Sequence, residues 1–386
     1  MIIKEVRAKK IKNSRNEDTV EISVKSSIGR AKASAPAGKS KGAHEKAYFK
    51  GSVDSIVKKI NSSDKLNGIK IEEFGDLKKI EKVFDYGSNP RVALEYAILK
   101  NFKKPYKKFN FGYRHLAIPL GNSIGGGLHS KGRKKPDFQE FLIYVERCRS
   151  FNSRVKINKL VYAYLKKAIS ARDEKFNGER NDEGAWRTNL SNIEVLDLLY
   201  EAVKTLSKKT GHTIRIGIDV AASSFYKNGF YCYRNYSRNN RTVKLNKKEH
   251  IEFLAHLVKK YRIGYLEDPV DEDHFHDFKE LKSLVGNCLI VGDDLTVTNF
   301  NRVKRAKGSI NAVIIKPNQI GSLIEVKKVV DFCKLNRIKT IFSHRSGETK
   351  EDFLADLSFM FGGDFLKAGI YGKEREAKYN RLRKIK

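Results

Sequence analysis

Five short apolar runs in the second half of the chain each end in a polar side chain that could take part in chemistry. In chain order these polar residues are Asp219, Glu267, Asp293, Lys316 and His344. A single polar residue at the end of a strand is usually a helix cap or a satisfied buried group. Five in series are hard to explain as caps, so we interpret them as one functional set.

The elements that carry these residues alternate between apolar runs rich in β-branched residues and helical stretches, which is typical of parallel βα units. A closed βα barrel places the carboxyl ends of its strands around one mouth, so side chains far apart in sequence converge there. The longer interval before Glu267 contains Asn228-Gly229 flanked by aromatic residues, which predicts an inserted hairpin. The pattern therefore predicts an α/β fold built on a TIM-like βα barrel.

The three carboxylates suit a hard, octahedral cation, and an all-oxygen ligand set favours magnesium over zinc or copper. We expect Asp219, Glu267 and Asp293 to be its ligands. Lys316, on the next predicted strand, would lie beside that cation, whose charge lowers the pKa of the ammonium group toward that of a working base. The set predicts magnesium-assisted removal of a proton next to a carboxylate group.

Residues 1–113 have a different pattern and predict an N-terminal α+β domain, followed by the barrel domain over residues 114–386. The stretch "TVEISV" alternates with the period of a strand, and two later stretches have helical spacing. Asn89 and Pro90 are expected to cap and open a further helix. The lysine-rich residues 100–115 mark the expected boundary, and we interpret them as a solvated linker.

The chain is strongly basic, with 78 Lys and Arg residues against 45 Asp and Glu residues and a formal net charge of +33. Anionic partners are therefore expected. The sequence contains no DNA- or RNA-binding motif and no phosphate-binding loop. Nucleic-acid binding is thus supported by charge alone, and we expect it to be weak and non-specific.

Cysteine usage and hydropathy favour a soluble, cytoplasmic protein without membrane contact. The four cysteines are far apart and include no CxxC pair, which argues against a structural zinc site and against a disulfide framework. The amino-terminal residues lack the continuous apolar core of a signal peptide. No run of the sequence approaches the roughly 20 apolar residues of a membrane-spanning helix.

Ten stretches, in order along the chain, resemble the enolase family and in part its archaeal branch. They are "SRNEDTVEI", "PAGKSKGAHE", "GNSIGGGLHS", "DFQEF", "NDEGAW", "LEDPVDED", "GDDLTVTN", "KPNQIGSL", "SHRSGET" and "EREAKYN". A lysine base beside magnesium is itself the known pattern of the enolase superfamily. The resemblance covers nearly the whole chain. It implies an enolase-type barrel with an N-terminal capping domain, a homodimer or higher homo-oligomer, and a hydro-lyase that interconverts 2-phosphoglycerate and phosphoenolpyruvate in glycolysis and gluconeogenesis.

The resemblance also implies roles in proton transfer and metal binding. Lys316 matches the base that removes the C2 proton, Glu183 the acid that helps the C3 hydroxyl depart, and Glu140 a residue that supports this acid. Two Mg²⁺ ions per active site are implied. Asp219, Glu267 and Asp293 match the ligands of the tight site. Ser40, in an amino-terminal loop that is mobile in the family, matches a ligand of the second ion, which arrives with the substrate.

Other matching residues are implied to bind the substrate, a phosphorylated hydroxy acid. His344, Arg345 and Ser346 match residues that hold the phosphate and adjoining groups, and Arg345 offers a planar donor fork for phosphate. Lys367 matches a lysine that binds the substrate carboxylate. His129 matches a substrate-binding histidine reached by the same closing loop.

Two alternatives to a working enolase stay open. One is another enzyme of the superfamily that dehydrates a different acid sugar. The other is a basic protein that uses this scaffold to bind nucleic acid or an acidic surface. Residues 16–18 depart from the family pattern, and Lys39 and Lys41 add two cations beside Ser40. None of these changes removes a predicted catalytic group, so the intact set argues against a pure binding role.

Overall fold

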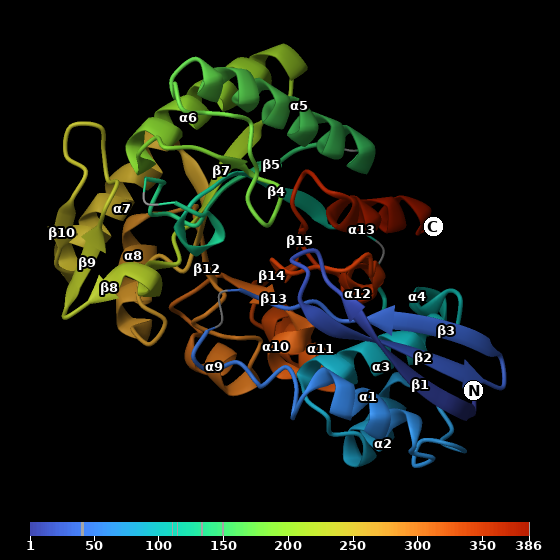
Figure 1. Ribbon diagram of the computed structural model, residues 1–386. Coiled ribbons are helices and arrows are strands. Elements are labelled where there is room, and N and C mark those ends of the chain that lie inside the picture. Colours follow the sequence, from blue (N-terminus) through green and yellow to red (C-terminus); the bar gives the residue numbers. More distant parts are fainter. Residues whose placement is uncertain (40–41, 110, 114, 133, 149, 386) are drawn as a thin grey trace.

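The amino-terminal part of the chain forms a three-stranded antiparallel sheet (Figure 1). The structure is a computed structural model and describes every residue except 40–41, 110, 114, 133, 149 and 386. The strands are β1 (Ile3–Lys12), β2 (Asp18–Ser26) and β3 (Gly29–Ser34), paired in that order. Val20, Ile22 and Val24 alternate along β2 and are fully buried, so the strand predicted from "TVEISV" is confirmed.

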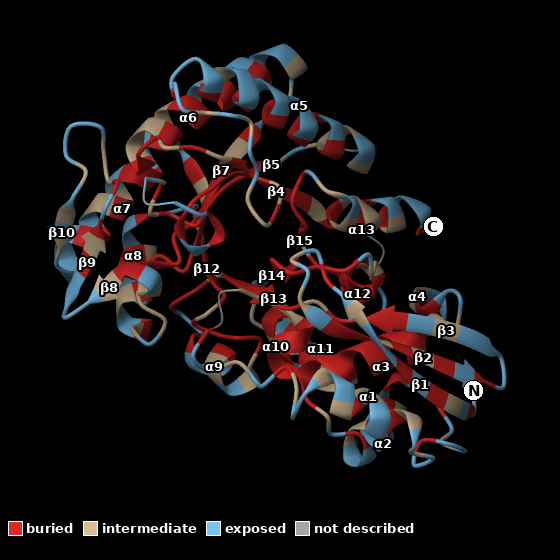
Figure 2. Cartoon of the chain, in the orientation of Figure 1, coloured by how far each residue is buried: buried red, intermediate tan, exposed pale blue. Residues whose placement is uncertain are grey.

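Helices pack against this sheet and connect it to the barrel. They are α1 (Val53–Asn61), α2 (Leu77–Val83), preceded by the 3₁₀ turn η1 (Phe74–Asp76), α3 (Ser88–Lys100) and α4 (Pro105–Lys108). Helix α3 contacts β2 and β3 on one side and the short barrel helix α10 (Pro317–Ile320) on the other. It is buried along nearly its whole length, as its red ribbon in Figure 2 shows, so it is the central packing element between the sheet and the barrel.

The start of α3 differs from the sequence prediction. Gly87 is the N-cap residue, whereas Asn89 and Pro90 lie inside the helix. The first backbone N–H groups of the helix donate to the carbonyl oxygens of residues 47–48, so they need no side-chain cap. Gly87 has a φ of 108°, and a Cβ there would lie 2.5 Å from a carbonyl oxygen of that segment. Close backbone approach, rather than a capping side chain, therefore sets the helix start.

The stretch interpreted as a solvated linker is only partly exposed to solvent, at residues 103–104, 107–108, 112 and 115 among those described. Phe109 is buried, with its ring centroid 6.2 Å from that of Phe74 and 5.0 Å from that of Phe102. The ring of Phe111 lies 5.4 Å from that of Phe361, which follows a barrel helix. The aromatic half of the basic and aromatic alternation thus packs the amino-terminal unit onto the barrel, and the linker interpretation is wrong for these residues.

Eight strands close into a barrel. They are β4 (Ile118–Gly125), β5 (Glu140–Val145), β7 (Ile214–Asp219), β11 (Ile263–Glu267), β12 (Leu289–Gly292), β13 (Ala312–Ile315), β14 (Lys339–Ser343) and β15 (Phe365–Lys367). Strand β15 pairs with β4 and closes the ring. The predicted TIM-like barrel is confirmed. A ninth short strand, β6 (Trp186–Arg187), adds to β4 from outside.

Strand β5 departs from the parallel pattern, because it runs antiparallel to both neighbours, β4 and β7. In the described part of the connection from β4 to β5, the only helical element is the 3₁₀ turn η2 (Gly127–His129). Adjacent strands joined without a crossover helix pair antiparallel. The reversal brings Glu140, the first residue of β5, to the mouth where the other strands end, in register with Asp219.

Helices surround the barrel and turn their buried faces toward it (Figure 2). They are α5 (Phe151–Ser170), α6 (Asn192–Thr210), α7 (Lys247–Tyr261), α8 (Phe275–Leu284), α9 (Phe300–Arg305), α11 (Leu323–Leu335), α12 (Phe353–Met360) and α13 (Lys373–Lys384). Capping boxes begin α6 and α7, at Ser191 and Asn246. Among the described helices, none is long and apolar enough to cross a membrane.

The hairpin predicted from Asn228-Gly229 is confirmed. Strands β8 (Tyr226–Lys227) and β9 (Phe230–Tyr233) are joined by these two residues, which both have positive φ as this tight turn requires. The 3₁₀ turn η3 (Ala222–Phe225) leads into the hairpin, and β10 (Val243–Leu245) adds a third strand. The inserted sheet accounts for the long interval between the first two predicted strand-end residues.

Candidate active site

The barrel brings the predicted strand-end residues to one mouth. Asp219, Glu267 and Lys367 are the last residues of β7, β11 and β15, and Glu267 is in register with Asp219. The residues that directly follow β12, β13 and β14 are Asp293, Lys316 and His344. Because these six strands are consecutive neighbours in the ring, their ends converge as the barrel hypothesis requires.

The ammonium group of Lys367 lies among three carboxylates. Its Nζ is 2.9 Å from Glu140 Oε2, 3.3 Å from Asp219 Oδ2 and 2.8 Å from Glu267 Oε2. All four side chains are buried. Burial disfavours the charged amine, but the three carboxylates outweigh it and raise the pKa of Lys367 well above its ordinary value. Burial, followed by repulsion from Asp219, raises the pKa of Glu267 to about 7.

Lys316 pairs with Asp293, through Nζ and Oδ2. Burial favours the neutral amine, but the Asp293 carboxylate raises the pKa of Lys316 above its ordinary value. The lowered pKa expected from sequence therefore depends on a cation that takes up the charge of Asp293. The carboxylate oxygens of Asp268 and Asp294 lie within 4.8 Å of those of Asp293, which adds to the acidic character of this side of the mouth.

The donor set fits a hard divalent cation. Four buried carboxylates, from Glu140, Asp219, Glu267 and Asp293, face the two lysine ammonium groups. Buried charges of one sign in excess are costly unless a counter-ion neutralises them. Burial is the first cause of the raised pKa of both Asp219 and Glu267, and repulsion from neighbouring carboxylates adds to it. A cation held by these oxygens would remove that cost.

Glu140 and Glu183 form a hydrogen-bonded acid pair beside this cluster. His129 Nδ1 lies 3.4 Å from Glu140 Oε1 and 3.5 Å from Glu183 Oε1. Asn122 Nδ2 donates to Glu183 Oε2 at 3.1 Å. Burial and the charge of Glu183 raise the pKa of Glu140 well above its ordinary value. Burial alone would raise the pKa of Glu183, but His129 and His344 lower it well below its ordinary value, so Glu140 holds a proton more readily than Glu183.

Arg375 sets the protonation state of His344. Its Nη1 donates to His344 Nδ1 at 2.8 Å, and because a guanidinium only donates, the ring carries its proton on Nε2. Burial and the charge of Arg375 lower the pKa of His344 well below its ordinary value. His344 Nε2 is buried, lies 3.6 Å from Glu183 Oε2, and has no hydrogen-bond partner among the described residues. His344 is therefore a neutral donor with capacity for a ligand.

Arg345 and Ser346 lie against the connection between β3 and α1, which Figure 1 shows in blue beside α9 and α10. Arg345 pairs through Nη1 and Nη2 with both carboxylate oxygens of Glu45, at 3.0 and 2.9 Å. Ser346 Oγ accepts a hydrogen bond from the backbone N–H of Lys39 at 2.8 Å. Ser40, the expected ligand of a second metal ion, lies outside the described residues.

Three residues of this site were not singled out from sequence. Arg375 holds His344, Glu45 holds Arg345, and Gln319 Nε2 donates to Asp293 Oδ1 at 3.0 Å. Each lies in one of the stretches that carry the family resemblance. They could have been found by asking which charged or amide side chains inside these stretches had not yet been given a role.

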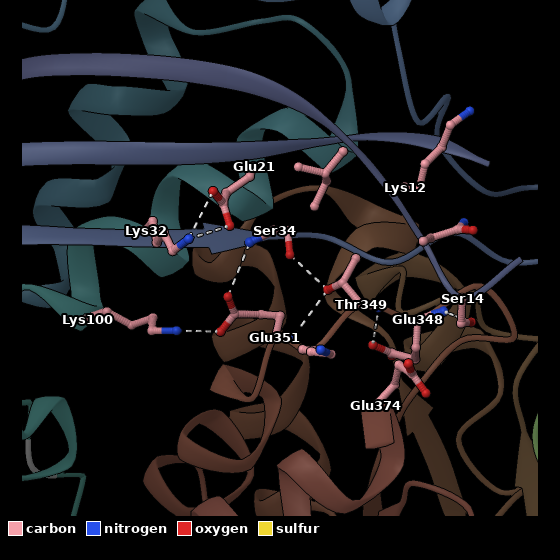
Figure 3. A pocket seen from close by; sticks show the side chains of 13 residues that line it. Lys12, Ser14, Glu21, Lys32, Ser34, Lys100, Glu348, Thr349, Glu351 and Glu374 are labelled. Carbon is pink, nitrogen blue, oxygen red and sulfur yellow. Dashed lines mark hydrogen bonds and ion pairs between the residues drawn. The ribbon is translucent and has the colours of Figure 1, made fainter. Parts of the chain in front are cut away.

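A separate cleft of about 450 Å³ lies where the amino-terminal sheet meets residues 348–351 (Figure 3). Its charges oppose each other in pairs, such as Lys100 with Glu351 at 2.8 Å and Lys32 with Glu21 at 3.2 Å. The backbone N–H of Ser34 also donates to Glu351. None of the predicted site residues that the structure describes lines this cleft, so it lies between the two parts of the chain and is separate from the mouth.

The fold and the mouth define a barrel enzyme in which lysines, carboxylates and histidines converge at the strand ends. The description "Enolase, C-terminal TIM barrel domain" matches residues 113–386. The enolases of Methanosphaera stadtmanae and Methanothermobacter thermautotrophicus are each 36% identical to the chain, over 100% of it and 96% of their own length. The enolase of Pyrobaculum aerophilum is 37% identical over 96% of the chain and 91% of its own. The chain belongs to the enolase family, which implies a metal cofactor.

Proposed function

We propose that the chain is a working enolase, a hydro-lyase that reversibly dehydrates 2-phosphoglycerate to phosphoenolpyruvate in glycolysis and gluconeogenesis. The observation that supports this most is the convergence of Lys316, Lys367 and the acid pair of Glu140 and Glu183 in one buried mouth. Elimination next to a carboxylate needs a base, an acid and positive charge near the growing negative charge. These residues supply all three.

Asp219, Glu267 and Asp293 would hold the first of two Mg²⁺ ions, and Ser40 would contribute to the second. Their oxygen donors favour magnesium over softer metals. Bound magnesium supplies positive charge that stabilises the developing negative charge on the substrate carboxylate. The three carboxylates also hold the two lysines in place, since Lys316 pairs with Asp293 and Lys367 pairs with the other two.

Proton transfer falls to two groups on separate segments, since Lys316 directly follows β13 and Glu183 lies in the turn before β6. Lys316, in its neutral form, removes the proton from C2. Glu183 gives a proton to the leaving C3 hydroxyl, and the hydrogen-bonded Glu140 stores the proton that Glu183 needs. Positioned general acids and bases of this kind each contribute roughly 10² to 10⁴ in rate.

Substrate binding falls to donors from several elements around the mouth. His344 Nε2 is available to a substrate oxygen, and Arg345 and Ser346 bind the phosphate. Lys367 binds the substrate carboxylate, and His129 contacts the substrate from the loop that carries η2. This concentration of donors and cations favours a phosphorylated substrate over an unphosphorylated acid sugar.

A spectrophotometric assay that follows phosphoenolpyruvate formation from 2-phosphoglycerate, with and without magnesium, tests the proposal. We expect magnesium-dependent turnover of 2-phosphoglycerate. Turnover of an unphosphorylated acid sugar with none of 2-phosphoglycerate would favour the superfamily alternative. No turnover of either, with tight binding of nucleic acid, would favour the binding alternative.

We also propose that residues 1–113 and 114–386 are separate domains, a division supported by the family match that begins at residue 113. A homodimeric assembly and a cytoplasmic location remain predictions from the resemblance and from cysteine usage. Limited proteolysis near the proposed boundary tests the division into domains. Sedimentation of the purified chain tests the oligomeric state.

A further inference from the structure

Glu45, a buried carboxylate without a role in the reaction, lies directly against Arg345. Its two oxygens accept from Nη1 and Nη2 of Arg345 at 3.0 and 2.9 Å, a fork-on-fork geometry that fixes the plane of the guanidinium group. The two side chains are only 3% and 2% exposed. Asn318 Oδ1 accepts a further hydrogen bond from Nη1 at 3.2 Å. Arg345 therefore has a fixed orientation in the absence of substrate.

The rest of the connection that carries Glu45 contacts the same guanidinium. Tyr48 Oη donates to this carboxylate at 2.9 Å and accepts from the backbone N–H of Gly38 at 3.2 Å. A Cβ at Gly38 would lie 2.0 Å from Arg345 Nη2, so the backbone itself is packed against the charged group. The connection is fastened to the barrel by two 2.8 Å backbone hydrogen bonds between Ala37 and Gly347.

Gln319 extends this network from Glu45 to the metal-binding side of the mouth. Its Nε2 donates to Glu45 Oε1 at 3.3 Å and to Asp293 Oδ1 at 3.0 Å. Thr298 Oγ1 donates to Gln319 Oε1 at 2.7 Å, which fixes the orientation of the amide. One continuous set of hydrogen bonds therefore joins Asp293 to Arg345 through Gln319 and Glu45.

We propose that Glu45 is a positioning residue, which orients Arg345 for the substrate phosphate and, through Gln319, ties that orientation to the metal-binding carboxylate Asp293. The inference rests on the proposed function, in which Arg345 binds the phosphate.

The reaction leaves the phosphate group chemically unchanged. Contacts to it are therefore equally strong in the ground state and in the transition state, and their loss raises KM rather than lowering kcat. Glu45→Gln keeps the shape of the side chain but removes its charge and one acceptor oxygen. We expect KM for 2-phosphoglycerate to rise at least about tenfold and kcat to change less than about threefold.

Calorimetric titration with inorganic phosphate, without magnesium, gives a readout independent of turnover. Only binding that Arg345→Ala abolishes is counted. We expect Glu45→Gln to weaken this binding at least about tenfold. Removal of a negative charge would by itself tighten phosphate binding, so weaker binding separates positioning from simple electrostatics. If 2-phosphoglycerate is not turned over, the proposed function fails, but the phosphate titration still tests the role of Glu45.

Glu272→Gln is the matched control. Glu272 Oε2 accepts from the backbone N–H of Ala43 at 3.2 Å, so it contacts the same connection, and among its described contacts none is to Arg345. We expect phosphate affinity within about twofold of wild type in this variant. Tyr48→Phe removes one hydrogen bond of Glu45 and keeps the ring, so it should weaken phosphate binding by about threefold to fivefold.

Three results would overturn the inference. Phosphate binding in Glu45→Gln that is unchanged or tighter would show that Glu45 competes with the ligand or does nothing. An equal loss in Glu272→Gln would show that only docking of the connection matters. If Glu45→Gln does not fold, unchanged phosphate affinity in Tyr48→Phe would overturn the inference.

Discussion

At the scale of single residues, the proposed base, Lys316, and the proposed acid, Glu183, differ mainly in their partners. Lys316 is paired with one carboxylate, Asp293, and can lose its proton only when that charge is taken up. Glu183 lies beside Glu140 and faces the donor side of His344. Lys316 directly follows β13 and Glu183 lies in the turn before β6, so each can be substituted without displacing the other.

Substitution of the base and of the acid should separate two steps of the reaction. Lys316→Ala should abolish exchange of the substrate C2 proton with solvent deuterium, a loss of at least about 10² in rate. Glu183→Gln should retain this exchange and block loss of the hydroxyl. Proton NMR of 2-phosphoglycerate in deuterated buffer measures the exchange. Exchange near the wild-type rate in Lys316→Ala would show that another group is the base.

The predicted metal ligands can be tested through the affinity for magnesium itself. Asp293→Asn removes one of three carboxylate ligands and leaves Lys316 without its partner. We expect the magnesium concentration for half-maximal activity to rise at least about tenfold. Magnesium binding measured by calorimetry should weaken in parallel. An unchanged magnesium dependence in both measurements would exclude Asp293 as a ligand.

At the scale of elements, the strand ends could be predicted from sequence, but contacts between distant elements could not. The positions of Asp219 and Glu267 follow from the βα repeat, because every strand of such a barrel ends at one mouth. The place of Glu140 depends on the reversed strand β5, and the five apolar residues that follow it, 141–145, do not indicate the direction of the strand. The pairing of Glu45 with Arg345 spans 300 residues and depends on how one connection folds over the barrel.

Helix α7, which packs against the inserted hairpin, carries a buried titratable group. His250, on α7, donates from Nε2 to the carbonyl oxygen of Pro269 at 2.8 Å and accepts at Nδ1 from Tyr233 Oη at 3.0 Å. Its ring stacks on that of Tyr231 with centroids 3.6 Å apart. Burial lowers the pKa of His250 to about 4. The folded protein therefore favours the neutral ring.

Stability should consequently fall in mildly acidic solution. The unfolded chain has a histidine pKa of about 6.5, so this contribution is complete above that pH and is lost as the pH falls toward the folded value of about 4. Between about pH 7 and about pH 5, we expect wild type to lose about 2 kcal/mol more free energy of unfolding than His250→Gln. Glutamine can keep both hydrogen bonds but does not titrate. Urea unfolding at both pH values measures the difference, and a constant difference would contradict the lowered pKa.

At the scale of the whole molecule, the net charge of +33 is the feature that the reaction itself does not require. Part of it lies near the mouth. Burial, followed by the charges of Lys39, Arg187 and Arg234, lowers the pKa of Lys135, which follows η2 in the chain. Cations close enough to shift each other's pKa also attract an approaching anion. We therefore expect the basic surface to guide a phosphorylated carboxylate to the mouth.

Salt should separate this guidance from nucleic-acid binding. Exposed charges are screened over about 8 Å at physiological ionic strength. Added salt at fixed free magnesium should thus lower kcat/KM more than kcat, because it slows the encounter with substrate and leaves the bound complex unchanged. Steady-state assays over a series of salt concentrations measure both kcat/KM and kcat. If kcat/KM does not respond, the basic surface does not guide the substrate.

Binding of nucleic acid would depend on salt for a different reason, since each neutralised phosphate releases a counter-ion and affinity falls steeply as salt is added. We expect at most weak binding that does not depend on base sequence, because charge is the only feature of the sequence that supports it. Fluorescence anisotropy with DNA and RNA oligonucleotides at physiological salt measures this. A sub-micromolar, sequence-selective complex would contradict the expectation. It would assign the basic surface to a second function that the barrel chemistry does not need.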